Sequence, residues 1–251
     1  MGFRFKAFGL HLLGSACLLA LVLGGLYLGW YRWPGWYLAG AARIALMMAG
    51  IDVVLGPLLT LLIANPSKPR RELARDVGMI VVVQLIAAGY GFATLWGGRP
   101  LYYTYSEKYL QMVQASDLRP EQIELGRKLN PSLAPHWYSL PRWIYAPLPK
   151  DKELARQIMG NSITGGDDVV QMPQYYKPWP EAEAEIRKNL KQLDKIGSVM
   201  PHDRKIITAR MKERGYAPEQ PILLPVVVRS KPMVAVVDPL SAQIKEFIAA
   251  Q

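Results

Sequence analysis

The stretch Ala7–Tyr31, AFGLHLLGSACLLALVLGGLYLGWY, contains no Asp, Glu, Lys or Arg. At a rise of about 1.5 Å per residue, a helix of roughly 25 residues crosses the ~30 Å hydrocarbon core of a bilayer. A cleavable signal peptide has a shorter apolar region, of about 7–15 residues, followed by a cleavage site of small residues. This run ends instead in the aromatic and basic residues Trp30-Tyr31-Arg32-Trp33. We therefore expect a retained transmembrane helix.

Two further apolar runs follow. Ile44–Ala64 is interrupted only by Asp52, and Val77–Trp96 only by Gln84. Asn65-Pro66 ends the second run, because the residue before a proline disfavours helical geometry. The sequence predicts an N-terminal three-helix transmembrane bundle over residues 1–98, with helices at about 7–31, 44–64 and 77–97.

The basic residues of the short connections set the expected orientation, because loops rich in Lys and Arg stay in the cytoplasm. The N-terminal tail and the second loop carry most of them: Arg4, Lys6, Lys68, Arg70, Arg71 and Arg75. The first loop has only Arg32 and Arg43. We expect the N-terminus inside, three spans, and everything after Gly98 outside.

The charge distribution divides the chain. Residues 1–97 hold 8 of the 30 Lys and Arg and 3 of the 20 Asp and Glu, so most charges lie in residues 98–251. That part has the composition of a soluble domain long enough to bury its own core. The pI near 9.6 does not indicate nucleic acid, since acids and bases are interspersed and no Arg/Lys-rich arm occurs. Cys17 is the only cysteine, so no intrachain disulfide can form.

Residues 99–251 have the pattern of an α+β domain, with strands at both ends and helices between them. Expected strands are Leu101–Tyr105, Tyr109–Gln114, Trp143–Ala146, Ile222–Val228 and Met233–Val237. Expected helices run from a cap at Asp117 to Leu129, and over Lys152–Gly160, Glu181–Ile196 and Asp203–Arg214, with stops at Gly197 and Gly215. Ser230-Lys231-Pro232 separates the last two strands, and Asp238-Pro239 turns into a short C-terminal helix.

Polar residues inside the apolar runs are the main candidates for function. An ionised Asp near a helix centre costs about 2.5–3.5 kcal/mol on insertion scales, so Asp52 needs an explanation. It either meets a cationic or hydrogen-bonding group on a client helix, or bonds Gln84 and holds the bundle together. Pro57 removes a backbone donor and is expected to free the carbonyl of Val53 and kink the helix. Gly56 allows close approach of another backbone, and His11 lies nearer the cytoplasmic end of the first helix.

The C-terminal part offers weaker candidates. Tyr175, Tyr176 and Trp179 lie in a proline-containing stretch that either forms a partner-binding loop or packs against the helices. Asp167-Asp168 follows two glycines, which favours a turn over an acid–base pair. His136 and His202 lack metal-ligand spacing, and no phosphate loop or nucleophile elbow is present. We expect no catalytic residues, no metal and no cofactor.

Four stretches resemble the type IV pilin accessory proteins of the TfpX/TfpZ (FimB-like) family. They are Phe5–Leu12, Gly50–Leu61, Gln84–Gly91 and Gly98–Tyr102. The resemblance covers the first hundred or so residues well and the remainder only in general order. It implies a non-enzymatic protein of the bacterial inner membrane, with its C-terminal domain in the periplasm, that helps a pilin accumulate or enter the pilus assembly machinery.

The leading hypothesis is therefore a pilin chaperone that binds the transmembrane helix and the periplasmic head of a type IV pilin. Its expected partners are that pilin, the lipid bilayer and other pilus assembly or accessory proteins, but not nucleic acid. The expected partner-binding residues are His11, Asp52, Gly56, Pro57, Gln84, Tyr175, Tyr176 and Trp179. One alternative is a membrane enzyme that modifies pilin or a lipid-linked substrate, with Asp52 or the Asp167-Asp168 pair as base. A third is a periplasmic ligand sensor, although the cytoplasmic side has no output module.

Overall fold

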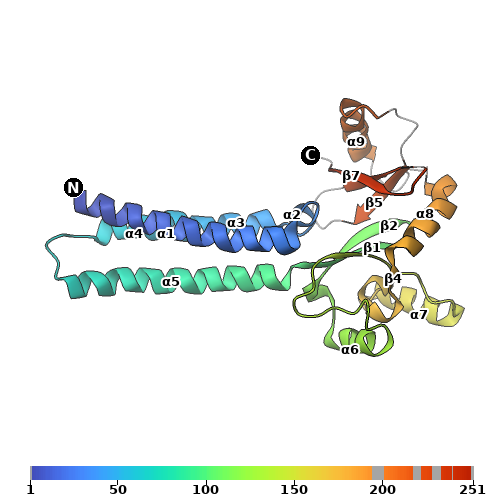
Figure 1. Cartoon of the computed structure of the whole chain (residues 1–251), viewed down its shortest axis with the longest axis horizontal. Coiled ribbons are helices and arrows are strands. Elements are labelled where there is room, and N and C mark those ends of the chain that lie inside the picture. Colours follow the sequence, from blue (N-terminus) through green and yellow to red (C-terminus); the bar gives the residue numbers. More distant parts are fainter. Residues whose placement is uncertain (1, 194–200, 217–221, 228–232, 239, 250–251) are drawn as a thin grey trace. The chain divides into compact units, whose positions relative to one another are not determined.

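The computed structural model describes residues 2–193, 201–216, 222–227, 233–238 and 240–249. The chain divides into two compact units, Met1–Arg99 and Pro100–Gln251 (Figure 1). We call them the N-terminal and the C-terminal unit. The expected stop at Gly197 and the turn at Ser230-Lys231-Pro232 lie outside the described residues.

The N-terminal unit is helical. Its elements are α1 (Gly2–Leu26), η1 (Tyr27–Tyr31), α2 (Gly35–Leu38), α3 (Ala41–Ala49), η2 (Gly50–Leu55), α4 (Gly56–Ile63) and α5 (Arg70–Gly97). Both η1 and η2 have π-helical geometry and continue their neighbours, so the described residues contain three helices long and apolar enough to cross a membrane: Gly2–Tyr31, Ala41–Ile63 and Arg70–Gly97. The three long apolar helices expected from the sequence are therefore present.

The helices extend beyond the apolar runs that predicted them. The third begins at Arg70 rather than Val77, because the charged segment between them continues the helix after Pro69. Arg, Glu, Leu and Ala are all good helix formers. A search for apolar runs misses a helical segment in which charged residues alternate with apolar ones. The first two helices likewise begin a few residues early, at Gly2 and Ala41.

Aromatic and small residues pack the N-terminal unit. A buried cluster joins α1 and η1 to α3 and α5 and contains Leu19, Leu26, Tyr31, Ala41, Met48 and Leu95. The Tyr31 hydroxyl donates a 2.6 Å hydrogen bond to the Leu95 carbonyl, and the rings of Trp30 and Trp96 meet edge to face at 5.0 Å. These contacts fix the ends of the first and third long helices against each other.

In the C-terminal unit, the described strands form one seven-stranded mixed sheet of order β4-β3-β1-β2-β5-β6-β7. The strands are β1 (Pro100–Ser106), β2 (Tyr109–Gln114), β3 (Arg142–Tyr145), β4 (Lys177–Pro178), β5 (Ile222–Val227), β6 (Met233–Val237) and β7 (Ile244–Ala249). The pairs β1–β3 and β2–β5 are parallel and the others antiparallel. The parallel β2–β5 pair joins the strands from the two ends of this unit into one sheet.

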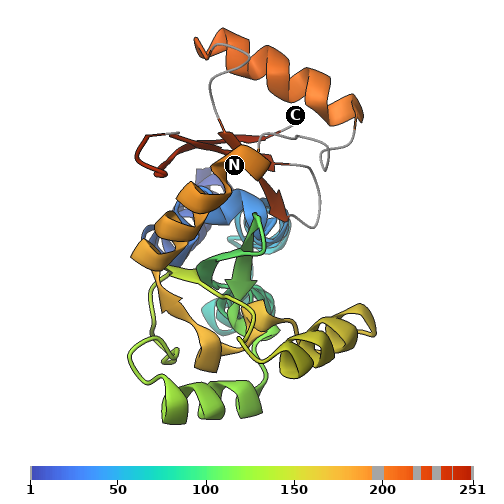
Figure 2. The same cartoon turned by 90° about the vertical axis from the view of Figure 1, so that its right-hand side faces the viewer.

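Helices cover both ends of this sheet. They are α6 (Pro120–Leu129), α7 (Lys152–Ile163), α8 (Trp179–Leu193) and α9 (Pro201–Glu213), with 3-10 turns η3 (Ala115–Asp117), η4 (Val169–Gln171) and η5 (Pro173–Tyr175). One core lies among β1, β2, β3, α7 and η4, and a second lies between α9 and strands β5–β7. Figure 2 shows α9 (orange, top) and α6 (green, bottom) at opposite ends of this unit.

Two expectations for the C-terminal unit are wrong. The residues after Asp238 form strand β7 rather than a helix, because Phe247 and Ile248 are buried against β6 in register with Ala235 and Val234. Asp117 does not cap α6, because its carboxylate accepts the backbone N–H of Gln114 at 2.8 Å and closes η3 instead. Helix α6 begins at Pro120, where the missing proline N–H costs no helical hydrogen bond.

Candidate functional site

A chain of hydrogen bonds links three helices of the N-terminal unit. His11 Nδ1 lies 2.6 Å from Thr60 Oγ1, and His11 Nε2 lies 2.8 Å from Gln84 Oε1. Gln84 Nε2 in turn donates a 2.9 Å hydrogen bond to the backbone carbonyl of Asp52. The structure therefore brings together the three polar residues singled out in the apolar runs and adds Thr60 to them.

Thr60 was missed by the sequence interpretation, although the sequence contains a signal for it. It follows Asp52 by eight residues and Gly56 by four, so all three recur on one face of a helix. Thr60 is 2% exposed, and a buried hydroxyl needs a partner. His11 supplies that partner.

The π-helical turn explains why Gln84 bonds a backbone carbonyl. The Gly56 N–H bonds the carbonyl of Ile51, five residues back instead of four. In that register the carbonyl of Asp52 would accept from residue 57, but Pro57 has no N–H. Gln84 supplies the missing donor. The carbonyl freed by the proline is therefore that of Asp52, not that of Val53 as the α-helical register predicted.

Gly56 makes the contact possible. A Cβ at this position would lie 2.0 Å from Gln84 Nε2, closer than any real side-chain contact. Any larger residue would displace the Gln84 amide, so Gly56 serves close packing within this unit. The hydrogen bond that Gly56 makes room for goes to the Asp52 carbonyl and leaves the Asp52 side chain out of the network.

The Asp52 carboxylate has no hydrogen bond or ion pair among the described residues. The residue is 7% exposed, and its Oδ1 is buried without a partner. An unpartnered buried polar atom is costly and therefore uncommon. The interpretation that the Asp52 side chain bonds Gln84 is wrong in its geometry, since Gln84 contacts only the Asp52 main chain.

Asp52 borders an apolar cavity of about 480 Å³ within the N-terminal unit. Most of its walls come from α1 and α5, with Met48 of α3 and Asp52 of η2, and its other lining residues include His11, Gly14, Ser15, Leu18, Gln84, Leu85, Ala88 and Gly89. Leu18 and Leu85 are 53% and 54% exposed, so the cavity opens onto the outer surface of the unit. Its volume lies in the range of ligand-binding pockets. It can accept apolar side chains around one hydrogen-bond donor.

The aromatic candidates of the C-terminal unit are partly used by its own core. Tyr176 is 4% exposed, its hydroxyl donates to the Val170 carbonyl at 2.5 Å, and burial raises its pKa. Tyr175 is half-buried against the same core. Trp179 stands at the start of α8, where its Nε1 donates to Glu183 at 3.0 Å. The side chain of Tyr176 is therefore not accessible to a partner, and the partner-binding role of the other two stays a prediction.

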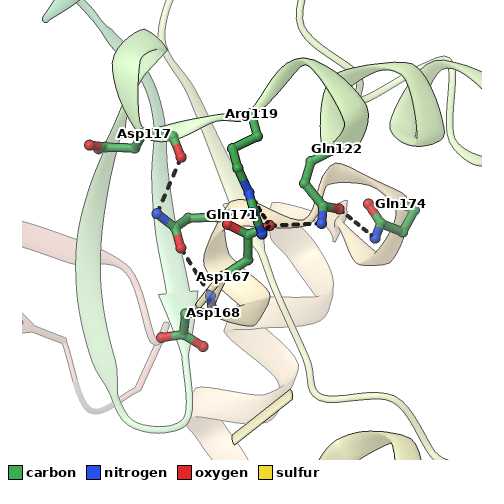
Figure 3. Close-up of polar contacts among 7 residues, drawn as sticks. All are labelled: Asp117, Arg119, Gln122, Asp167, Asp168, Gln171 and Gln174. Atoms are coloured by element: carbon green, nitrogen blue, oxygen red, sulfur yellow. Dashed lines mark hydrogen bonds and ion pairs between the residues drawn. The ribbon is translucent and has the colours of Figure 1, made fainter. Parts of the chain in front are cut away.

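The Asp167-Asp168 pair belongs to a network that joins a loop to α6 (Figure 3). Asp167 forms an ion pair with Arg119 and accepts a 2.8 Å hydrogen bond from Gln122, and the hydrogen bond to Asp167 raises the pKa of Arg119. Asp168 instead caps η4, accepting from the Val169 N–H at 2.6 Å. The two carboxylates thus have separate structural partners.

No cluster of three or more His, Cys, Asp or Glu suited to a metal occurs among the described residues.

The sequence is similar to known proteins that are named for fimbrial assembly. The chain is 30% identical over 121 residues to the fimbrial assembly protein of serogroups C1 and C2 of Dichelobacter nodosus, covering 48% of this chain and 92% of that protein.

Two further relatives come from the same organism. The fimbrial assembly protein of serogroup E1 is 26% identical over 233 residues, covering 90% of this chain and 86% of the relative. That of serogroup I is 27% identical over 195 residues, covering 76% and 73%. No protein-family profile matches the sequence, and no solved structure matches it.

Proposed function

The chain belongs to the family of fimbrial assembly proteins, and on that premise we propose that it is a non-enzymatic accessory protein that binds and stabilises the major pilin of a type IV pilus. Membership of the family supports a role in pilus biogenesis. The names of the relatives describe assembly and not a chemical reaction, which is consistent with a role that needs no catalytic site.

The proposed location is the bacterial inner membrane. The three long apolar helices support membrane association. We place the N-terminus and the connection between α4 and α5 in the cytoplasm, because their Lys and Arg outnumber those of the other connection. The C-terminal unit then lies in the periplasm, where it can contact the head of a pilin whose helix waits in the bilayer.

The observation that carries the proposal is the unpartnered carboxyl of Asp52 beside an open apolar cavity. A client helix that brings a cationic or hydrogen-bonding group would satisfy this carboxyl, while its apolar side chains fill the space between α1 and α5. Gly14 and Gly89 on the walls have no heavy atom within 4 Å of an added Cβ, so the backbone of a client can approach closely there. The remaining candidates, His11, Gly56, Pro57 and Gln84, hold this arrangement in place.

Site-specific photo-crosslinking in cells that express the pilin tests this proposal. The crosslinking amino acid is placed at Leu85, which lines the cavity, and at Val82, which lies on the same helix outside the lining. The two positions are matched, since they are 54% and 56% exposed. We expect capture of pilin from position 85 and much less from position 82. Equal capture from both positions, or none, would contradict a client helix in the cavity.

Two further variants separate binding from folding. Asp52→Ala should lower the capture from position 85 and the pilin level while the protein keeps its own abundance, because Gln84 bonds the main chain of residue 52 and not its side chain. Gly89→Leu should fill the cavity and act in the same direction. Gly78→Leu is its control, because this glycine of α5 also has open space around it but does not line the cavity.

A further inference from the structure

A tight turn of the C-terminal unit carries two aromatic side chains at its tip. The His136 N–H donates to Ser139 Oγ at 2.8 Å, and the Ser139 N–H donates to the His136 carbonyl at 3.1 Å. Trp137 and Tyr138 are the two central residues and are 72% and 59% exposed. Gly, Asn, Asp, Ser and Pro usually occupy such positions, because they favour the backbone angles of a turn or hydrogen-bond to its main chain. Large aromatic side chains here indicate a contact surface.

Hydrogen bonds fix the residues next to the turn. Ser139 is buried, and the Tyr102 hydroxyl donates a 2.6 Å hydrogen bond to the carbonyl of Leu133 on the approaching segment. Two guanidinium groups bond carbonyls of that segment: Arg142 Nη1 donates to Ser132 at 3.0 Å, and Arg127 Nη2 donates to Pro135 at 3.4 Å. Hydrogen bonds therefore hold the segment before the turn, and two of their donors are cations.

The stretch of sequence that contains the turn has charges of one sign. Residues 127–150 contain no Asp or Glu, but they contain Arg127, Lys128, Arg142 and Lys150. The rest of the chain after residue 98 mixes acids and bases. Leu140, directly after the turn, is 57% exposed and adds apolar surface beside the two aromatics. An exposed Trp, Tyr and Leu among cations is the composition that anionic bilayer surfaces attract.

We propose that the turn His136–Leu140 docks on the surface of an anionic bilayer, with Trp137 and Tyr138 in the interfacial region and the neighbouring cations facing lipid phosphates. This inference rests on the membrane insertion proposed above, but not on the binding of pilin. Only Gly98 and Arg99 separate α5 from β1, and Arg142, two residues after the turn, pairs with Tyr102 near the start of β1. We favour a bilayer over a protein as occupant because the acid-free stretch 127–150 carries four cations around the two aromatics.

Fluorescence quenching of the full chain in nanodiscs tests the inference. Leu140→Cys in a Cys17→Ser background is labelled with an environment-sensitive dye, which leaves Trp137 and Tyr138 in place. The lipids are phosphatidylcholine with or without phosphatidylglycerol, and carry a quencher high on the acyl chain. We expect several-fold quenching that increases with phosphatidylglycerol and is lost when Trp137 and Tyr138 are both changed to Ser.

Two controls make the outcome decisive. Ile163→Cys, labelled in the same background, is an exposed apolar position at the end of α7 and should not be quenched. The natural Cys17, exposed on α1, reports insertion and should be quenched. Quenching at position 140 as weak as at position 163, with Cys17 quenched, would overturn the docking while leaving insertion intact. An unquenched Cys17 would overturn insertion as well, and shielding of position 140 only on addition of pilin would assign the turn to a protein partner instead.

Discussion

Gln84 holds Asp52 through the main chain, because its Nε2 donates to the Asp52 carbonyl at 2.9 Å while the Asp52 carboxylate has no partner among the described residues. The main chain and the side chain of Asp52 therefore have different roles. The Asp52 carbonyl accepts from Gln84 the hydrogen bond that Pro57 cannot donate, and the residue lines a cavity of about 480 Å³. Removal of the Asp52 side chain should therefore weaken binding of the proposed client more than it lowers the stability of the N-terminal unit.

Gly56→Ala should destabilise the N-terminal unit. The new Cβ would meet Gln84 Nε2 at 2.0 Å and force the amide away from both the Asp52 carbonyl and His11. Overpacking of this kind costs about 1–3 kcal/mol. The measurement is the thermal unfolding midpoint of the full chain in detergent.

Gly50→Ala is the matched control, because it lies in the same helix and has no heavy atom within 4 Å of its Cβ position. It should unfold at or above the wild-type temperature, since Ala favours a helix over Gly by up to about 1 kcal/mol. Adding Gln84→Ala to Gly56→Ala should remove the clash, so that the effects of the two substitutions are not additive. Additive losses would show that the Gln84 amide is not what opposes Gly56→Ala.

The proposed topology predicts which positions an impermeant thiol reagent reaches. In a Cys17→Ser background, Ser162→Cys on α7 should be labelled once the outer membrane is permeabilised. Ser67→Cys, in the connection between α4 and α5, should react only after the inner membrane is opened. Ser67 is exposed and Ser162 is partly exposed, so neither position is buried within its own unit. The reverse pattern would invert the orientation.

Apolar length and charge predict the three long helices because a bilayer imposes a length and a composition on each span. They do not predict where a helix ends within charged sequence, as the early start of α5 at Arg70 shows. Strand β7 was missed for a related reason. Its sequence IKEFIA fits a helical as well as a strand period over so few residues, and only its pairing with β6 decides between them.

The site was predictable in membership and not in geometry. Asp52, Gln84 and His11 stand out because polar residues in apolar helices are costly. Which atoms meet depends on a π-helical turn that shifts the register by one residue, and a single sequence does not announce such a turn. Tyr176 illustrates the opposite difficulty, because an aromatic beside prolines is equally compatible with a surface loop and with the core position that it occupies.

The stability of the β6–β7 connection should depend on pH through Asp238. Its side chain accepts from Lys245 at 2.6 Å and from the N–H groups of Leu240 and Ser241, and these contacts hold its pKa well below the usual value. A carboxyl with a lowered folded-state pKa stabilises above its unfolded pKa of about 3.9, and this contribution is lost as pH falls toward the folded value. Asp238→Asn should therefore accelerate hydrogen exchange in β7 at neutral pH and have little effect in strong acid. An equal effect at both would contradict a contribution from ionisation.

Asp167→Asn separates a structural carboxylate from a catalytic one. Asp167 lies 2.9 Å from Arg119 Nε and accepts from Gln122, so removing its charge should lower the unfolding midpoint of the C-terminal unit. If the pair Asp167-Asp168 served as a base in modification of pilin, the mass of pilin would change in the variant. We expect an unchanged pilin mass, measured by intact mass spectrometry, in the wild type, in Asp167→Asn and in a strain lacking the protein. A mass difference that disappears with the protein, and equally with Asp167→Asn, would make the enzyme the better account of this chain.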